Sequence, residues 1–208
     1  MPGWFDLRGI EFGRVDPSRF DHQGIQESVD YVGSLIQQEV EAGIPANRIV
    51  VGGFSQGGHI AFKTLLAARR ALAGCIALST WLEPTFQAQV ADEVKRVPVF
   101  IGHGSADPLV PAFLASTSQS TLQARGFSNV SMHVYPGLAH SSCAQEIDEA
   151  RDFLLKVIPD KPPPTAAEVE QMSVKQLKEF LRSRHINTST MLEKTELVAR
   201  AKAECGSN

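Results

Sequence analysis

The stretch RIVVGGFSQGGHIAF, residues 48–62, joins two kinds of sequence pattern. Its first part holds the continuous β-branched run 49–51, which favours a strand buried on both faces. The part after it is rich in alanine and leucine, which predicts a helix over 56–71. Between them, Gly53-Phe54-Ser55-Gln56-Gly57 has the G-x-S-x-G spacing of a sharp strand-to-helix turn that exposes a serine hydroxyl. The pattern predicts Ser55 as a nucleophile, and its plainer interpretation is an ordinary glycine-rich turn.

The rest of residues 1–158 alternates between the same two patterns. Apolar residues recur at helical spacing over 23–41, and Gly43 and Pro45 then end the helix. Further strands are predicted at 74–79, 97–102 and 129–135, and further helices at 113–125 and 142–157. Strands that alternate with helices form βαβ units, so we expect an α/β fold: a parallel sheet with helices on both faces.

A run of prolines marks a domain boundary. Residues 159–165 read PDKPPPT, and prolines at this density favour an extended spacer over a helix. We therefore divide the chain into an α/β domain over 1–158, a linker over 159–165 and a small helical module over 166–208. Two pairs of residues with capping-box spacing predict two short helices in the module: Ser173 with Gln176, and Thr190 with Glu193.

Composition and charge argue against several classes of protein. The chain has 208 residues, a net charge of −3 and no block of like charge, so we expect no binding of nucleic acid. Its three cysteines are widely spaced, which argues against a disulfide framework or a zinc site and favours a reducing compartment. The sequence shows neither a signal peptide nor an apolar stretch long enough to span a bilayer. We expect a soluble, cytoplasmic protein without a bound metal.

A serine nucleophile needs a base, and the base needs an acid that orients it. In folds with this turn, the chain order is serine, acid, histidine. Asp107 follows the strand predicted at 97–102 and His140 follows the strand predicted at 129–135, so both fall at the edge where open α/β sheets place their sites. Their plainer interpretations are a turn-forming Asp before proline and a polar residue at a helix entry. His103 competes by position but lies on the loop of the acid, so we predict His140 as the base.

Seven short motifs occur in the same order as in a known family. They are Trp4-Phe5-Asp6, Gly43-Ile44-Pro45, Asn47-Arg48-Ile49, residues 52–58, residues 78–82, residues 103–111 and His140-Ser141-Ser142. Together they resemble the acyl-protein thioesterase branch of the phospholipase/carboxylesterase family over about residues 1–158. The resemblance implies an α/β-hydrolase that removes S-palmitoyl groups from protein cysteines, with some lysophospholipase or carboxylesterase activity and no cofactor. It also assigns Ser55, Asp107 and His140 to a catalytic triad.

Further site residues follow from the turn and from the resemblance. The backbone N–H of Gln56, the residue after the serine, is expected to donate to the oxyanion of the reaction. By analogy with the family, four apolar residues are expected near the acyl channel, with an ordinary core position as the alternative: Trp81, Leu82, Leu109 and Phe113. A carboxylesterase for small esters is a further alternative, which differs only in the depth of this channel.

The sequence departs from the family ahead of Trp4. Family members carry two further strands there and a His-Gly-x-Gly-Asp loop, which supplies the second oxyanion donor. Only 54 residues precede Ser55 in this sequence, with one convincing strand among them. We therefore expect the strand that leads to Ser55 to lie at an exposed sheet edge, prone to aggregation or to pairing with another chain. The alternative function is a catalytically impaired adaptor that uses the esterase scaffold for binding.

The module over 166–208 resembles a SAP-type helix–loop–helix, chiefly through residues 173–181 and 193–198. Such modules often bind nucleic acid or proteins. This one holds seven Lys/Arg and six Glu, a net charge of +1, which is poor for binding phosphates. We therefore expect the module to contact a protein partner or to have a purely structural role.

Overall fold

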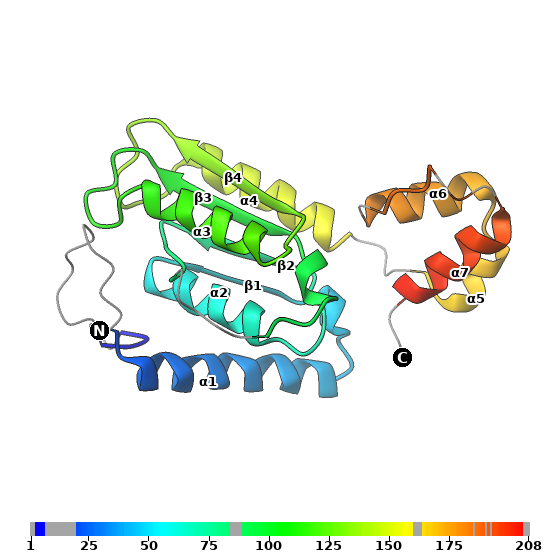
Figure 1. The fold of residues 1–208 in the computed structure, drawn as a ribbon, viewed down its shortest axis with the longest axis horizontal. Coiled ribbons are helices and arrows are strands. Elements are labelled where there is room, and N and C mark those ends of the chain that lie inside the picture. The colour runs from blue at the N-terminus through cyan, green and yellow to red at the C-terminus, as the bar shows by residue number, and fades with distance from the viewer. Residues whose placement is uncertain are drawn as a thin grey trace. The chain divides into compact units, whose positions relative to one another are not determined.

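The computed structural model of the chain describes residues 3–6, 20–83, 89–159, 164–184, 186–189, 191 and 193–205. The chain divides into two compact units, unit 1 over Met1–Pro159 and unit 2 over Asp160–Asn208. Unit 1 contains the sheet, and unit 2 is helical (Figure 1). Each unit has a hydrophobic core of its own.

Unit 1 is built on a sheet of four parallel strands. In spatial order they are β1 (Val50–Phe54), β2 (Gly74–Leu78), β3 (Val99–Gly104) and β4 (Val130–Tyr135). Gly53 of β1 lies opposite Ala77 of β2, so the two strands end level with each other beside Ser55. All six residues of β3 are buried, as expected of an inner strand covered on both faces. The expected α/β fold with a parallel sheet is confirmed.

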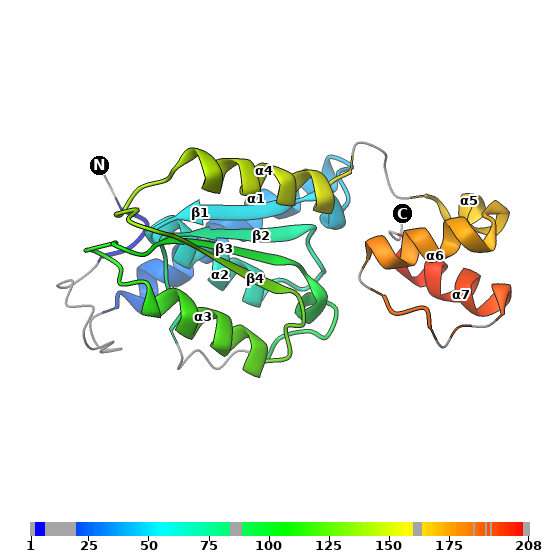
Figure 2. The same ribbon diagram turned by 90° about the horizontal axis from the view of Figure 1, so that it is seen from above.

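Four helices pack around this sheet. They are α1 (His22–Glu41), α2 (Gln56–Ala67), α3 (Phe113–Ala124) and α4 (Ala144–Val157), accompanied by the short 3-10 turns η2 (Ala46–Arg48) and η3 (Val94–Arg96). Figure 2 shows α4 on one face of the sheet and α2 and α3 on the other. The helix predicted over 56–71 ends earlier, at Ala67, because the backbone of Ala68 is extended. No helix in the described part of the chain is both long enough and apolar enough to cross a membrane.

Two groups of buried apolar residues stabilise unit 1. The larger lies between the sheet and helices α2 and α3, and includes Phe62, Leu65, Ile101 and Leu122. The smaller joins the N-terminal segment 3–6 to α1, α2 and the loop after β2; it consists of Phe5, Ile25, Val29, Ile60, Trp81, Val110 and Leu114. The second group therefore holds the N-terminal segment close to the start of α2, which follows Ser55.

β1 is the outermost strand of the sheet on its side, within the described residues, and its strand partner there is β2. The strand is five residues long, and Gly52 and Phe54 on it are exposed. The strand that leads to Ser55 thus has the expected edge position in this part of the chain. Its pairing with another chain remains a prediction.

Unit 2 contains three helices in its described part, α5 (Ala166–Gln171), α6 (Val174–Ser183) and α7 (Lys194–Glu204). They enclose a small core of Val169, Leu177, Leu181, Leu197 and Ala201. The capping box of Ser173 with Gln176 is confirmed at the start of α6. The predicted box of Thr190 with Glu193 is wrong, because Glu193 itself caps α7 and its box partner is Glu196; Thr190 lies outside the described residues. Helix α5 has only six residues and was not predicted from the sequence.

Candidate active site

The turn from β1 into α2 places Ser55 in an unusual backbone conformation. Its φ is 56° and its ψ is −121°, a region that residues other than glycine rarely adopt. The backbone around this turn leaves no room for a side chain at position 53, since a Cβ atom on Gly53 would lie 2.3 Å from the carbonyl carbon of Gly57. The Ser55 N–H donates to the Leu78 carbonyl at 2.9 Å, and the Thr80 hydroxyl donates to the Ser55 carbonyl at 2.7 Å. These contacts hold the strained residue in place.

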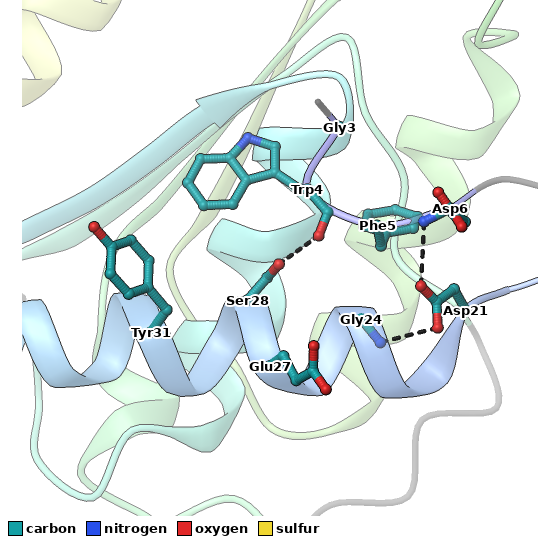
Figure 3. A pocket seen from close by; sticks show the side chains of 9 residues that line it. All are labelled: Gly3, Trp4, Phe5, Asp6, Asp21, Gly24, Glu27, Ser28 and Tyr31. Carbon is teal, nitrogen blue, oxygen red and sulfur yellow. Dashed lines mark hydrogen bonds between the residues drawn. The ribbon is translucent and has the colours of Figure 1, made fainter. Parts of the chain in front are cut away.

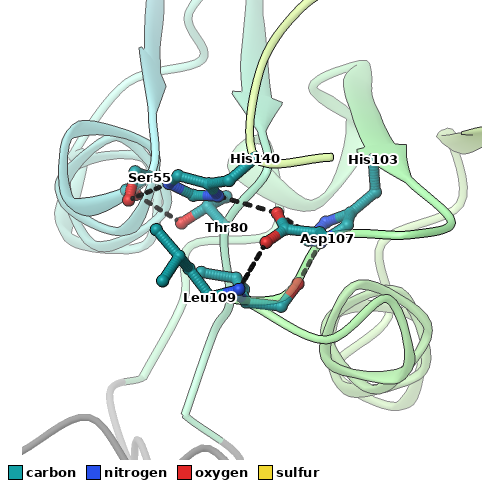
Figure 4. A network of polar contacts seen from close by, with 7 residues as sticks. Ser55, Thr80, His103, Asp107, Leu109 and His140 are labelled. Carbon is teal, nitrogen blue, oxygen red and sulfur yellow. Dashed lines mark hydrogen bonds and ion pairs between the residues drawn. The ribbon is translucent and has the colours of Figure 1, made fainter. Parts of the chain in front are cut away.

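The structure brings the three predicted polar side chains together (Figure 4). His140 Nε2 lies 3.0 Å from Ser55 Oγ, and His140 Nδ1 lies 2.7 Å from Asp107 Oδ2. Asp107 and His140 come from the loops that follow β3 and β4, and Ser55 follows β1. The carboxyl ends of three parallel strands therefore deliver an acid, an imidazole and a hydroxyl in one hydrogen-bonded row. The ring of Phe54 packs against the His140 ring, with 4.8 Å between the ring centroids.

Asp107 is held in its charged form. Burial alone would raise its pKa, but the N–H of Val110, the ring of His140 and the N–H of Leu109 all donate to the carboxylate, and its pKa is below the usual value. An ionised carboxylate can only accept hydrogen bonds, so Nδ1 of His140 must carry the proton that it shares with Asp107. Nε2 of the neutral imidazole then has a free lone pair, which faces the hydroxyl of Ser55.

The competing histidine, His103, has a different place in the structure. Its side chain is fully buried, and its Nε2 lies 2.7 Å from the Val110 carbonyl and 3.5 Å from Asp107 Oδ2. Burial lowers the pKa of this imidazole, so a neutral ring is favoured. His103 therefore packs behind the acid, on the side away from its contact with His140 (Figure 4). The sequence analysis placed His103 on the loop of the acid, but it is a residue of β3, four positions before Asp107.

Gln56 connects the N-terminal segment to the turn. Its side-chain Oε1 accepts from the Trp4 N–H at 3.3 Å, and its Nε2 donates to the Phe5 carbonyl at 3.0 Å. Gln56 is the first residue of α2, where backbone N–H groups have no acceptor within the helix. In the part of the chain that the structure describes, this N–H has no acceptor, so it can donate to a ligand next to Ser55. These side-chain contacts were not predicted from the sequence, because they join residues 52 and 51 positions apart.

The four apolar residues expected near an acyl channel divide into two pairs. Trp81 and Leu82 are only 2% exposed and belong to the two cores of unit 1, which is the alternative considered for them. Leu109 and Phe113 are 50% and 55% exposed, respectively. Figure 4 shows the side chain of Leu109 extending toward Ser55 and His140. An apolar group bound at Ser55 would therefore contact Leu109. Trp81 and Leu82 are part of the hydrophobic cores instead.

The family model described as phospholipase/carboxylesterase matches residues 1–158. The chain belongs to this family. An acyl-protein thioesterase 1 of Cryptococcus neoformans is 40% identical over 173 residues, which cover 76% of this chain and 72% of that protein. An acyl-protein thioesterase 1 of Gibberella zeae is 40% identical over 167 residues, which cover 77% of this chain and 70% of that protein.

Solved structures of similar proteins give the same fold. Arabidopsis thaliana SOBER1 is 26% identical with a TM-score of 0.67, and the match covers 76% of this chain and 75% of that one. Zea mays acyl-protein thioesterase 2 is 26% identical with a TM-score of 0.61, over 75% and 72% of the two chains. Unit 1 therefore belongs to the phospholipase/carboxylesterase family of hydrolases and has the α/β-hydrolase fold.

A different family model matches unit 2. Residues 164–203 match a family model named E3 ubiquitin-protein ligase rififylin-like domain. The match covers a minor part of the chain, and the similarity to a SAP-type module remains a prediction.

Proposed function

We propose that this chain hydrolyses long-chain acyl thioesters of protein cysteines, together with related carboxyl esters and lysophospholipids, through an acyl-enzyme formed on Ser55. One observation carries the proposal: Ser55 Oγ, His140 and Asp107 form a continuous hydrogen-bonded row with separations of 3.0 and 2.7 Å. The substrate class is supported by the relatives of unit 1 that are named acyl-protein thioesterases.

The first half of the reaction acylates Ser55. His140 Nε2 takes the proton from Ser55 Oγ as the oxygen attacks the acyl carbonyl carbon, and the imidazolium that forms is stabilised by the carboxylate of Asp107. The tetrahedral intermediate then collapses, the bond between carbonyl carbon and sulfur breaks, and His140 gives the proton to the leaving cysteine thiolate. A serine ester of the acyl group remains on the enzyme.

The second half releases the fatty acid. Water takes the place of the thiol, and His140 Nε2 removes a proton from it as its oxygen attacks the ester carbonyl. The bond to Ser55 Oγ breaks, and the proton returns from His140 to that oxygen. Every proton thus moves between groups of this chain, the substrate and water, so the proposed mechanism assigns no cofactor a part in it.

The negative charge of both tetrahedral intermediates lies on the former carbonyl oxygen. The backbone N–H of Gln56, at the start of α2, is the proposed donor to this oxygen, and the partial positive charge at the helix N-terminus adds to its effect. The acyl chain would extend over Leu109 and Phe113, which are the exposed apolar members of the expected set.

Hydrolysis of a palmitoyl-cysteine peptide by the purified chain tests the proposal. Ser55→Ala should reduce kcat by about 10⁶, because the nucleophile is removed while the fold is kept. Ser120→Ala is the matched control, since that serine is exposed on α3 and donates only to the Ser116 carbonyl. Activity of Ser55→Ala close to that of the parent chain would overturn the assignment of the nucleophile.

The second candidate function is a non-catalytic adaptor. Such an adaptor would use the esterase scaffold of unit 1 for binding, without turnover. Labelling by a fluorophosphonate probe separates the two functions: labelling that depends on Ser55 supports the hydrolase, and a folded chain that takes up no label supports the adaptor.

A further inference from the structure

A cavity of about 400 Å³ opens between the N-terminal segment and α1 (Figure 3). Two aromatic rings, Trp4 and Tyr31, and three carboxylates, Asp6, Asp21 and Glu27, are among its lining residues. No lysine, arginine or histidine is among the lining residues in the described part of the chain. The described lining of the cavity therefore combines aromatic rings with acidic side chains.

The cavity lies next to the residues that follow Ser55. The Trp4 N–H donates to the side chain of Gln56, and the Trp4 Nε1 atom would lie only 3.3 Å from a Cβ atom on Gly57. The Trp4 carbonyl accepts from the hydroxyl of Ser28, which fixes the same segment to α1 (Figure 3). A group bound in the cavity would thus lie beside a substrate that is attached to Ser55.

The aromatic rings of the cavity are open to a ligand. Trp4 is 45% exposed and Tyr31 is 58% exposed, and Figure 3 shows both rings at the same end of the cavity. The faces of indole and phenol rings carry partial negative charge and attract cations. The backbone of Trp4 is held through its N–H and its carbonyl, which anchors this residue between Gln56 and α1.

The start of α1 does not oppose a cation here. A helix N-terminus carries partial positive charge, but Asp21 caps α1 by accepting from the Gly24 N–H at 2.9 Å, and it also accepts from the Asp6 N–H at 3.3 Å. Asp21 therefore serves the helix and the backbone. The carboxylates that we assign to a ligand are Asp6 and Glu27, of which Glu27 accepts a hydrogen bond from the neutral amide of Gln23.

From this arrangement we infer that the cavity binds a lysine or arginine side chain of the protein substrate, close to the acylated cysteine. The inference rests on the proposed function, because it places the cysteine at Ser55. A lysine ammonium is a compact cation on a flexible stem, suited to carboxylates at the edge of an aromatic cavity. Because Trp4 lies against Gln56 and Gly57, which follow Ser55, the basic residue belongs close to the cysteine in the substrate sequence.

Two octanoyl-cysteine peptides test the inference, one with lysine beside the cysteine and one with norleucine, which has an apolar stem without the charge. At low salt, the parent chain should cleave the lysine peptide with a kcat/KM about three- to tenfold higher, through a lower KM. The double variant Asp6→Asn/Glu27→Gln should lose this preference and leave the norleucine peptide unaffected. Glu39→Gln is the matched control, an exposed α1 carboxylate outside the cavity lining.

Equal kcat/KM for both peptides in the parent chain would overturn the inference, as would a double variant that slows both peptides alike. Binding of the same peptides to Ser55→Ala, measured by fluorescence anisotropy at low salt, separates this result from failure of the proposed function. A preference for the lysine peptide in binding, without turnover by the parent chain, would support the cavity and reject the hydrolase. Turnover of both peptides without a preference for the lysine peptide would support the hydrolase and reject the cavity.

Discussion

Two buried carboxyl groups of unit 1 lie in opposite environments. Asp107 accepts hydrogen bonds from two backbone N–H groups and from His140, which hold its pKa below the usual value. Glu146 on α4 is fully buried, and neither of its carboxyl oxygens has a hydrogen-bond partner in the described residues. Burial, followed by the charge of Glu149, raises the pKa of Glu146 to about 6. The first group is prepared to stabilise a cation, and the second is kept neutral at mildly acidic pH.

Asp107→Asn should leave the fold intact and lower kcat by about 10⁴. The amide can donate to His140 Nδ1 and so favour the tautomer in which Nε2 is protonated and unable to accept the proton of Ser55. Steady-state hydrolysis of the palmitoyl-cysteine peptide measures the loss. Asp92→Asn is the control, because that aspartate is exposed and pairs with Lys95 on the surface. A loss of less than about tenfold for Asp107→Asn would mean that the acid has another identity.

Glu146→Gln should make the chain more stable at pH 8. The folded-state pKa of about 6 lies above the unfolded value of about 4.3, so the stability that Glu146 contributes is full below about pH 4 and is lost as pH rises through 6. Glutamine removes this loss, and we expect a gain of about 1–2 kcal/mol in the free energy of unfolding at pH 8 relative to pH 4. Urea denaturation at the two pH values measures it, with Glu39→Gln as the exposed control. An unchanged pH dependence would contradict the assigned environment.

At the scale of elements, the turn between β1 and α2 depends on close backbone packing. A Cβ atom on Gly53 would lie 2.3 Å from the carbonyl carbon of Gly57 and 2.4 Å from its oxygen, and backbone cannot move aside as a flexible side chain can. The same Cβ on Gly33, within α1, would meet nothing within 4 Å. Alanine should therefore disturb the backbone at position 53 and fit without a clash at position 33.

Gly53→Ala should destabilise the chain by more than about 2 kcal/mol and reduce labelling by the fluorophosphonate probe, because the turn must open to admit the methyl group. Gly33→Ala should stabilise it by about 0.5–1 kcal/mol, since alanine is the better helix former and its side chain meets no neighbour. Thermal unfolding of the two variants measures the difference. A Gly53→Ala chain that unfolds at the same temperature as the parent would contradict the packing of the turn.

The order of elements and the three polar side chains could be predicted from the sequence, because each depends on local signals. The β-branched run and the G-x-S-x-G spacing indicate Ser55. The loops after two further strands place Asp107 and His140 at the same edge of the sheet. The burial of Trp81 depends on which helix packs over it, and the Gln56 contacts join distant segments, so no local pattern shows them. The cap of α7 was mistaken because a nearby threonine had the same spacing as the true box at Glu193.

At the scale of the whole molecule, the chain holds two units with separate cores. The core of unit 2 consists of five small or aliphatic residues, each fully buried, so the loss of any large one removes a major part of it. Unit 1 keeps its own apolar clusters, which share no residue with that core. The two units should therefore respond separately to a core mutation.

Leu177→Ala should unfold unit 2 alone, because a buried leucine truncated to alanine typically costs about 2–5 kcal/mol, much of what a core of this size provides. Limited proteolysis should release fragments from residues 160–208 and leave unit 1 intact and able to react with the probe. Val174→Ala, an exposed position on the same helix, is the control. Loss of unit 1 together with unit 2 would show that the units depend on each other.

The most direct test of the central claim is peptide mapping by mass spectrometry after reaction with the fluorophosphonate probe. We expect the adduct on Ser55 in the parent chain and almost none in His140→Ala, because the hydroxyl then lacks the base that lies 3.0 Å away. An adduct on another residue, or equal labelling of Ser55 with and without His140, would contradict the proposed catalytic row.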